Sequence, residues 1–143
     1  MRRDNLRVAI GTKLLDNRNE WLSVSELAYS TGASLRQIGS ALSQIEGIDL
    51  DTDQEEWGRK VRLNADDEEA ERIWVFLMNW RYHRGDIREV IIECIPYSGW
   101  ISLRDLSEDT EIQQVDVART LSYMSSISSM GTGKQIMYKR GDA

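Results

Sequence analysis

The sequence is poor in the residues that metal sites, disulfides and nucleophilic catalysis use. Its 143 residues include one cysteine, Cys94, and one histidine, His83. A single cysteine excludes an internal disulfide and a cysteine-based zinc site, and a lone histidine lowers the expectation of metal binding or histidine catalysis. Cys94 falls on the apolar stripe of an expected helix, so we interpret it as a core residue without an activating partner. We therefore expect no cofactor and no metal.

Long apolar runs and catalytic motifs are missing as well. No stretch approaches the roughly 20 apolar residues of a membrane span, and the N-terminal MRRDN is too short and polar for a targeting signal. The glycine-rich stretch 131–134 lacks the flanks of a phosphate-binding loop, because Ser128 and Gln135 stand where Gly and Ser or Thr are needed. No carboxylate pair is placed in an apolar pocket. We expect a cytoplasmic protein that is not an enzyme and has no membrane partner.

An excess of positive charge is also absent. The net charge is −6, with 9 Lys and Arg against 10 Asp and Glu in residues 1–65, 3 against 5 in residues 66–84, and 6 against 9 in residues 85–143. Non-specific nucleic-acid binders usually carry a clear basic footprint. The charge lowers the expectation of such binding, although an acidic protein can still carry a local basic face.

What the sequence does contain is an internal repeat. The segment Trp21–Ile48 recurs as Trp100–Ile127 at a constant offset of 79. Seven pairs are identical: Trp21 and Trp100, Ser23 and Ser102, Leu27 and Leu106, Thr31 and Thr110, Leu42 and Leu121, Ser43 and Ser122, Ile48 and Ile127. The repeat predicts two related units. Domains of roughly 60 residues bury only about 60% of their unfolded surface, so we expect each unit to be marginal alone.

Apolar spacing and turn residues predict the same elements in each unit. In the first unit we expect helices at 5–15, 25–31 and 34–47, a short strand at 21–24, and a hairpin of 48–50 and 60–63 around an acidic tip at 51–56. Asp4, Ser23 and Ser34 are the expected N-caps. The expected buried stripe of the third helix is Leu35, Ile38, Leu42 and Ile45.

The second unit repeats this order. We expect a helix over 87–95 that Pro96 ends, a strand at 100–103, and a helix that Ser102 caps. A third helix, roughly 113–125, buries Val117, Leu121 and Met124, and a hairpin of 127–130 and 135–139 closes the unit.

A different helix is expected between the units, over residues 66–84. Ile73, Phe76, Leu77 and Trp80 share one face of it, and Trp74 and Met78 flank that face. A helix apolar over so much of its circumference should be buried. It either packs the two units together or contributes to a dimer interface. His83 ends it, where a cation suits the helix dipole.

This order of elements resembles the winged-helix superfamily, in which a β-hairpin wing follows a helix-turn-helix. The resemblance rests on the element order, on Trp-[Leu/Ile]-Ser-x-x-[Glu/Asp]-Leu at each strand-to-helix junction, and on the apolar spacing of the third helices. It implies a mostly α protein with small β-hairpins, an α+β class. We expect winged-helix domains at 1–65 and 85–143, joined by a linker helix at 66–84.

In DNA-binding members of this superfamily the third helix enters the major groove and the wing contacts the backbone. The resemblance therefore implies a set of polar candidates for contact with double-stranded DNA: Arg36, Gln37, Ser40, Ser43, Gln44, Arg59, Lys60, Arg62, Arg119, Lys134, Lys139 and Arg140. The alternative is that these are solvated surface residues. The acidic tip, with Asp51, Asp53, Glu55 and Glu56, opposes phosphate contact at the first wing.

Two functions follow from these observations. The first is a DNA-binding regulator of transcription or plasmid-type replication. The second is a non-enzymatic protein–protein adaptor of a larger assembly, similar to tandem winged-helix proteins of chromosome-condensing, polymerase-associated and membrane-sorting assemblies. The adaptor function is favoured by the outward face of the third helix in the second unit. This face presents Val115 and Tyr123 beside Arg119, Ser122 and Asp116. The candidate contacts with a protein partner or a second copy are Trp74, Met78, Val115 and Tyr123.

Overall fold

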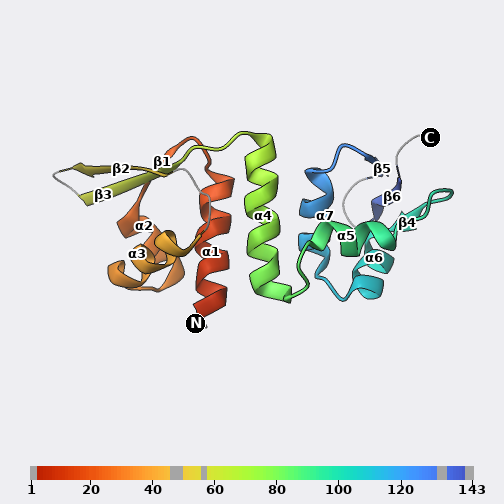
Figure 1. Ribbon diagram of the computed structural model, residues 1–143, viewed down its shortest axis with the longest axis horizontal. Helices are drawn as coiled ribbons and strands as arrows, with labels where there is room; N and C mark the ends of the chain where they lie inside the picture. The colour runs from red at the N-terminus through yellow and green to blue at the C-terminus, as the bar shows by residue number, and fades with distance from the viewer. Residues whose placement is uncertain (1–2, 46–49, 56–57, 132–134, 141–143) are drawn as a thin grey trace. The chain divides into compact units, whose positions relative to one another are not determined.

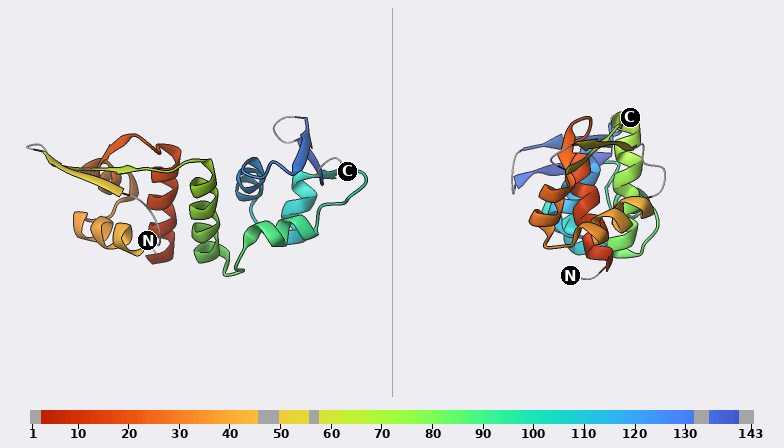
Figure 2. Two further views of the ribbon diagram at one scale, coloured as in Figure 1. Left: turned by 45° about the horizontal axis from the view of Figure 1, so that its top comes forward. Right: turned by 90° about the vertical axis from the view of Figure 1, so that its left-hand side faces the viewer.

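The computed structural model describes residues 3–45, 50–55, 58–131 and 135–140. The chain divides into two compact units, Met1–His83 and Arg84–Ala143. The first unit therefore includes the helix that we expected to be a linker. Figures 1 and 2 show the path of the chain through each unit.

The two units share one order of elements. The first contains α1 (Arg3–Asp16), β1 (Trp21–Ser23), α2 (Val24–Thr31), α3 (Leu35–Gln44), β2 (Leu50–Glu55), β3 (Gly58–Leu63) and α4 (Asp67–Tyr82). The second contains α5 (Ile87–Glu93), β4 (Ile101–Ser102), α6 (Leu103–Thr110), α7 (Gln114–Ser122), β5 (Ile127–Met130) and β6 (Met137–Arg140). The antiparallel sheets have the equivalent orders β1-β3-β2 and β4-β6-β5. The predicted α+β class is confirmed, and each unit has the winged-helix order of elements.

The repeated capping residues explain why the helices coincide at the offset of 79. The Ser23 hydroxyl accepts a hydrogen bond from the Glu26 N–H, and Ser102 does the same for Asp105. Gly32 and Glu111 end α2 and α6 in the left-handed region, with φ values of 72° and 59°. Satisfying the first free N–H groups of a helix fixes where it begins. Both helix-turn-helix segments are thus set by local sequence.

Each unit has its own apolar core between the helices and one face of its sheet. In the first unit the buried side chains include Ile10, Leu14, Leu27, Ile38, Val61 and Leu63. In the second unit they include Ile87, Ile91, Leu106, Val117 and Tyr138. Since successive strand residues point to opposite faces, the neighbours of Val61 and Tyr138 on β3 and β6 point outward.

Helix α4 packs antiparallel against α1 within the first unit (Figures 1 and 2). The Arg7 guanidinium lies 4.8 Å from the centroid of the Trp80 ring near one end of the pair. At the other end Asn19 exchanges two hydrogen bonds of 3.2 Å with the backbone of Ala65. The chain entering α4 is therefore tied to the loop that leaves α1.

Several local expectations are wrong. Helices α5 and α7 end at Glu93 and Ser122, earlier than expected, and Met124 is half-buried. Asp4 lies inside α1, α3 ends at Gln44, and Leu35 is 59% exposed because the buried stripe of α3 begins one turn later. The acidic residues do not form a loop tip, since β2 continues through Asp51 and Asp53 in register with the basic β3. Cys94 is half-buried at the C-cap of α5.

Candidate interaction surfaces

The surface of α3 keeps fewer free polar groups than its sequence predicts. Arg36, Gln37, Ser40 and Ser43 are exposed and Gln44 is half-buried. The Gln37 side chain, however, accepts a 2.9 Å hydrogen bond from the Ser34 N–H in a capping box. The Ser43 hydroxyl donates to the Ser40 carbonyl at 2.8 Å. Arg36 is the one charged residue of α3.

Two of the three cations of the first wing are opposite acidic residues in the strand register. Arg62 pairs in register with Asp51, Lys60 with Asp53, and Arg59 with Gln54. Directly opposite positions on antiparallel strands are neighbours, and β2 has Asp51, Asp53 and Glu55 against Arg59, Lys60 and Arg62 on β3. The Arg62 guanidinium also covers Trp21, 4.6 Å from the ring centroid. This wing is locally neutral rather than basic.

Two wing cations of the second unit, Arg140 and Lys139, contact other residues of that unit. Arg140 donates from Nε to the Ile95 carbonyl at 2.8 Å and from Nη2 to the Ile92 carbonyl at 2.7 Å, and its guanidinium lies 4.1 Å from the centroid of Tyr97. It thus satisfies carbonyls at the C-terminal end of α5. Lys139 Nζ lies 5.1 Å from the centroid of Trp100. Lys134 lies outside the described residues.

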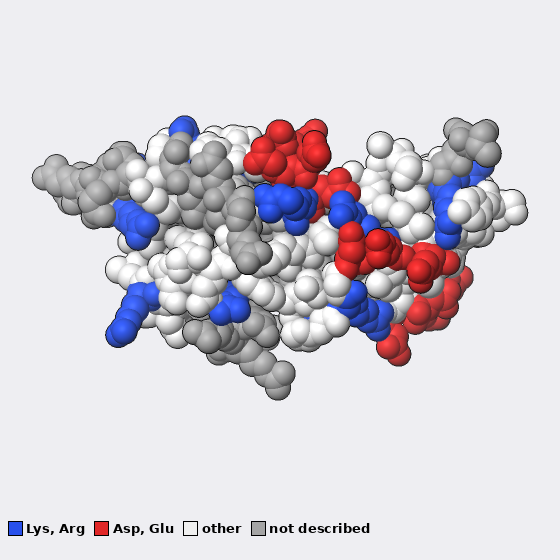
Figure 3. Space-filling view, in the orientation of Figure 1, with Lys and Arg blue, Asp and Glu red and all other residues white. Residues whose placement is uncertain are grey.

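On the face that Figure 3 shows, the described carboxylates gather and the described cations do not. Figure 3 shows Asp and Glu clustered at the N-terminal end of α4, where Asp67, Glu68 and Glu69 form the first turn. Lys and Arg are scattered in the same view. Among the described residues of this face, Lys and Arg form no continuous stripe of the kind that phosphate binding uses.

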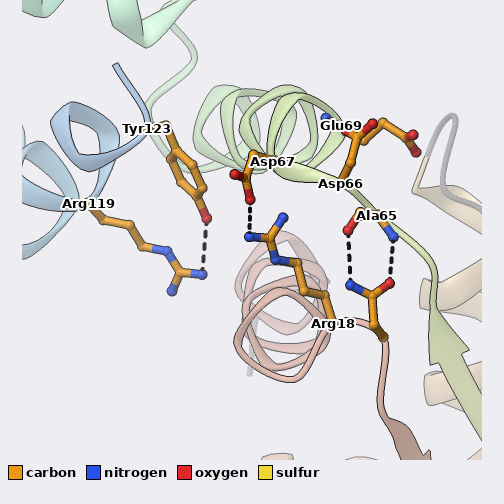
Figure 4. A network of polar contacts seen from close by, with 8 residues as sticks. Arg18, Ala65, Asp66, Asp67, Glu69, Arg119 and Tyr123 are labelled. Atoms are coloured by element: carbon orange, nitrogen blue, oxygen red, sulfur yellow. Dashed lines mark hydrogen bonds and ion pairs between the residues drawn. The ribbon is translucent and has the colours of Figure 1, made fainter. Parts of the chain in front are cut away.

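The four expected protein-contact residues divide into two groups. Trp74 and Met78 are 2% and 0% exposed, so both side chains are buried in this chain. Val115, in contrast, is 69% exposed on α7. Tyr123 is half-buried at the C-cap of α7, and its hydroxyl accepts a 3.4 Å hydrogen bond from Arg119 (Figure 4). Asp116, expected beside this surface, is buried at 3% exposure.

Several large apolar side chains lie on the surface, and of these the sequence analysis placed only Val115 there. Among the described residues, the large apolar side chains classed as exposed are Trp21, Tyr29, Leu35, Tyr97, Trp100, Val115 and Met130. Leu35 is the first residue of α3 and Val115 the second of α7. The third helix of each unit therefore begins with an exposed aliphatic side chain. The sequence signal for both is a position in the first turn of the helix: Leu35 directly follows the N-cap Ser34, and Val115 is the second residue after the N-cap Gln113.

Other kinds of site find no support within the described part of the chain. It contains no group of three or more His, Cys, Asp or Glu side chains placed to hold a metal ion. None of its helices combines the length and apolar character that crossing a bilayer requires.

Comparison with known proteins gives one structural likeness and no sequence match. No family model matches the sequence, and no curated protein matches it. The crystal structure of ScpB from Mycobacterium tuberculosis is similar at 16% sequence identity, covering 98% of this chain and 92% of that chain, with a TM-score of 0.35. At that TM-score the likeness supports no statement about function.

Proposed function

We propose that this protein is a non-enzymatic adaptor whose two winged-helix units contact protein partners. The observation that carries the proposal is the use of the wing cations inside the chain: Arg140 holds carbonyls of α5, and Arg62 covers Trp21 opposite an acidic position. Duplex binding draws its affinity from cations that are available to phosphates. Among the described residues, few of the predicted cations meet that requirement.

The exposed ends of the third helices support the same proposal. Leu35 is 59% and Val115 69% exposed, at the start of α3 and α7 respectively. Exposed aliphatic side chains beside polar neighbours suit the apolar centre and polar rim of a protein interface. On each helix this end is the one that a winged-helix unit would present to a ligand.

The test is purification of the tagged full chain from its own cells after in-cell crosslinking and nuclease treatment. We expect a stoichiometric protein partner that is lost with Leu35→Asp or Val115→Asp and kept with the control Ser25→Asp, an exposed residue of α2. Folding of each variant is checked by circular dichroism. If no protein is recovered with the wild type, or if both third-helix variants retain the partner, the proposed function in this form is wrong.

DNA binding by α3 is the second candidate function. Arg36, Ser40 and Ser43 are exposed at spacings of four and three residues, and α3 contains no acidic residue. Arginine can read guanine in the major groove. The test is fluorescence anisotropy with a duplex pool at low and physiological salt. Binding that weakens linearly in log salt, and an Arg36→Ala cost of about 1–3 kcal/mol, would favour this function over the adaptor.

A further inference from the structure

The outward face of the second wing is more apolar than that of the first. Tyr138 of β6 is 4% exposed and faces the core, so its neighbours Met137 and Lys139 point to the opposite face. Met130 and Ser128 of β5 lie in register with them and share that face. Met130 is 49% exposed and Trp100, under Lys139, is 36% exposed. We call Trp100, Ser128, Met130, Met137 and Lys139 the wing face.

The two wings differ in the residue opposite the cation that covers the tryptophan. In the first unit the cation that covers the tryptophan is Arg62, and the residue opposite it on the edge strand is Asp51. In the second unit the equivalent cation is Lys139, and the residue opposite it is Ser128. The described strands β4, β5 and β6 contain no acidic residue. At this register position the first wing has an acidic residue, whereas the described strands of the second wing have none.

Strand β5 is also an open edge. It lies at the end of the described sheet, and its sequence ISSM contains none of the charges or prolines that usually protect an edge strand. The Arg140 N–H bonds to the Pro96 carbonyl, and the Ile136 carbonyl accepts from Leu103. Even-numbered residues of β6 therefore face β4, and odd-numbered ones face β5. By register, Ser128 and Met130 bond to β6, which leaves the N–H and carbonyl of Ser129 at the open edge.

We propose that the second wing binds an extended segment of a partner protein as an added strand along β5. The segment carries an apolar residue and, two positions further on, Asp or Glu. In antiparallel pairing the apolar side chain lies beside Met130, and the carboxylate lies beside Ser128, two strand spacings or about 10 Å from the backbone of Lys139. Lys139 Nζ lies over Trp100 on the β4 side of β6, so binding requires this flexible side chain to turn toward β5. The small Ser128 side chain leaves room there for the ammonium group to meet the carboxylate. The inference deepens the adaptor function and rests on it, but it uses a surface distinct from Leu35 and Val115.

The apolar part of this site suits a partner of variable sequence. Methionine side chains are flexible and polarisable and adapt to different neighbours. Main-chain hydrogen bonds to an edge strand provide affinity, and alternate side chains provide specificity. The register therefore selects for the spacing between the apolar and acidic residues rather than for a single sequence.

The experiment is selection of a random linear peptide library on the immobilised full chain. We expect the enriched peptides to alternate, with an apolar residue two positions before Asp or Glu and no proline between them. A synthetic fluorescent copy of an enriched peptide should bind wild type and Ser129→Ala equally. It should bind Ser129→Pro and Ser128→Glu about tenfold more weakly, because the first removes the outward N–H and the second neutralises Lys139.

Controls separate this inference from loss of folding and from failure of the adaptor function. Proline is tolerated at edge positions whose N–H faces outward, and circular dichroism checks the fold of Ser129→Pro. If Ser129→Pro does not fold, the affinities of Ser128→Glu and Ser128→Gln for the peptide are compared instead. The proposal expects weaker binding only for Ser128→Glu. No enriched peptide, or equal binding to all variants, overturns the added strand while leaving the Leu35 and Val115 contact untouched. A dimer in light scattering that Ser129→Pro dissociates would identify a second copy as the occupant and overturn a partner segment.

Discussion

Gly11 of α1 and Leu77 of α4 are so close that a β-carbon on Gly11 would lie 2.5 Å from Leu77 Cδ2. Leu77 is 0% exposed, so its side chain has little room to move aside. The absence of a side chain at Gly11 therefore sets how closely α4 approaches α1. The two helices form one packed layer of the first unit.

We expect Gly11→Ala to destabilise the first unit by about 1–3 kcal/mol, the usual cost of overpacking, less the gain of up to about 1 kcal/mol in helix propensity. Urea unfolding followed by circular dichroism measures the change. Gly39→Ala in α3 is the matched control, because its β-carbon meets nothing within 4 Å. It should stabilise the protein through propensity alone. Equal effects of the two substitutions would contradict close packing at Gly11.

Gly32→Ala tests the left-handed end of α2. Gly32 has φ of 72° and open space around a β-carbon, so only the backbone conformation resists a side chain. We expect a loss of about 1 kcal/mol in the free energy of unfolding. Gly32→Asn should cost less, since asparagine adopts this region more readily. Thermal unfolding of the two variants side by side gives the comparison, and the reverse order would refute it.

Arg140→Gln tests the internal role of a residue that the sequence suggested for DNA contact. It removes the hydrogen bonds to the Ile92 and Ile95 carbonyls and the contact with Tyr97. We expect a loss of about 1–3 kcal/mol in stability, because hydrogen bonds from charged groups are the stronger ones. Lys139→Gln, which removes only the contact with Trp100, should cost less than about 1 kcal/mol. Differential scanning calorimetry distinguishes the two variants.

Asp86 should make stability depend on pH in the acid range. The side-chain hydrogen bond from Arg88 lowers the pKa of Asp86 below its ordinary value of 3.8, against the opposing effect of burial. Because the pKa of Asp86 is lower in the folded than in the unfolded protein, the ionised carboxylate stabilises the fold. This stabilisation is complete above the pKa of the unfolded state and is lost as the pH falls through the pKa of the folded state. Asp86→Asn should therefore reduce the slope of unfolding free energy against pH below about pH 4. Urea titrations at several pH values measure that slope, and an unchanged slope would exclude this contribution.

Much of the architecture could be predicted from local sequence. The offset of 79 predicted equivalent helices, and Ser23, Ser34 and Ser102 cap them as expected. Strand β5 spans the predicted residues 127–130. These features depend on a few neighbouring residues, so a short sequence pattern is enough to predict where each helix or strand begins.

The candidate surfaces were harder to predict. Arg140 and Lys139 read alike in the sequence, yet Arg140 bonds to carbonyls 45 and 48 residues away and Lys139 lies over an aromatic ring. Leu35 reads as part of a buried stripe but lies on the surface. Whether a polar group is free for a partner depends on contacts between distant segments, which periodicity does not reveal.

The sequence by itself determined that this protein is a repeat of one helix–strand–helix–helix–hairpin unit, because caps, turn glycines and apolar spacing act over a few residues. Only the tertiary structure decided that α4 belongs with α1, and that the first wing balances its cations with acidic positions while the second leaves an open edge beside Lys139. Those features arise from strand register and helix packing, which bring together residues that are far apart in the chain.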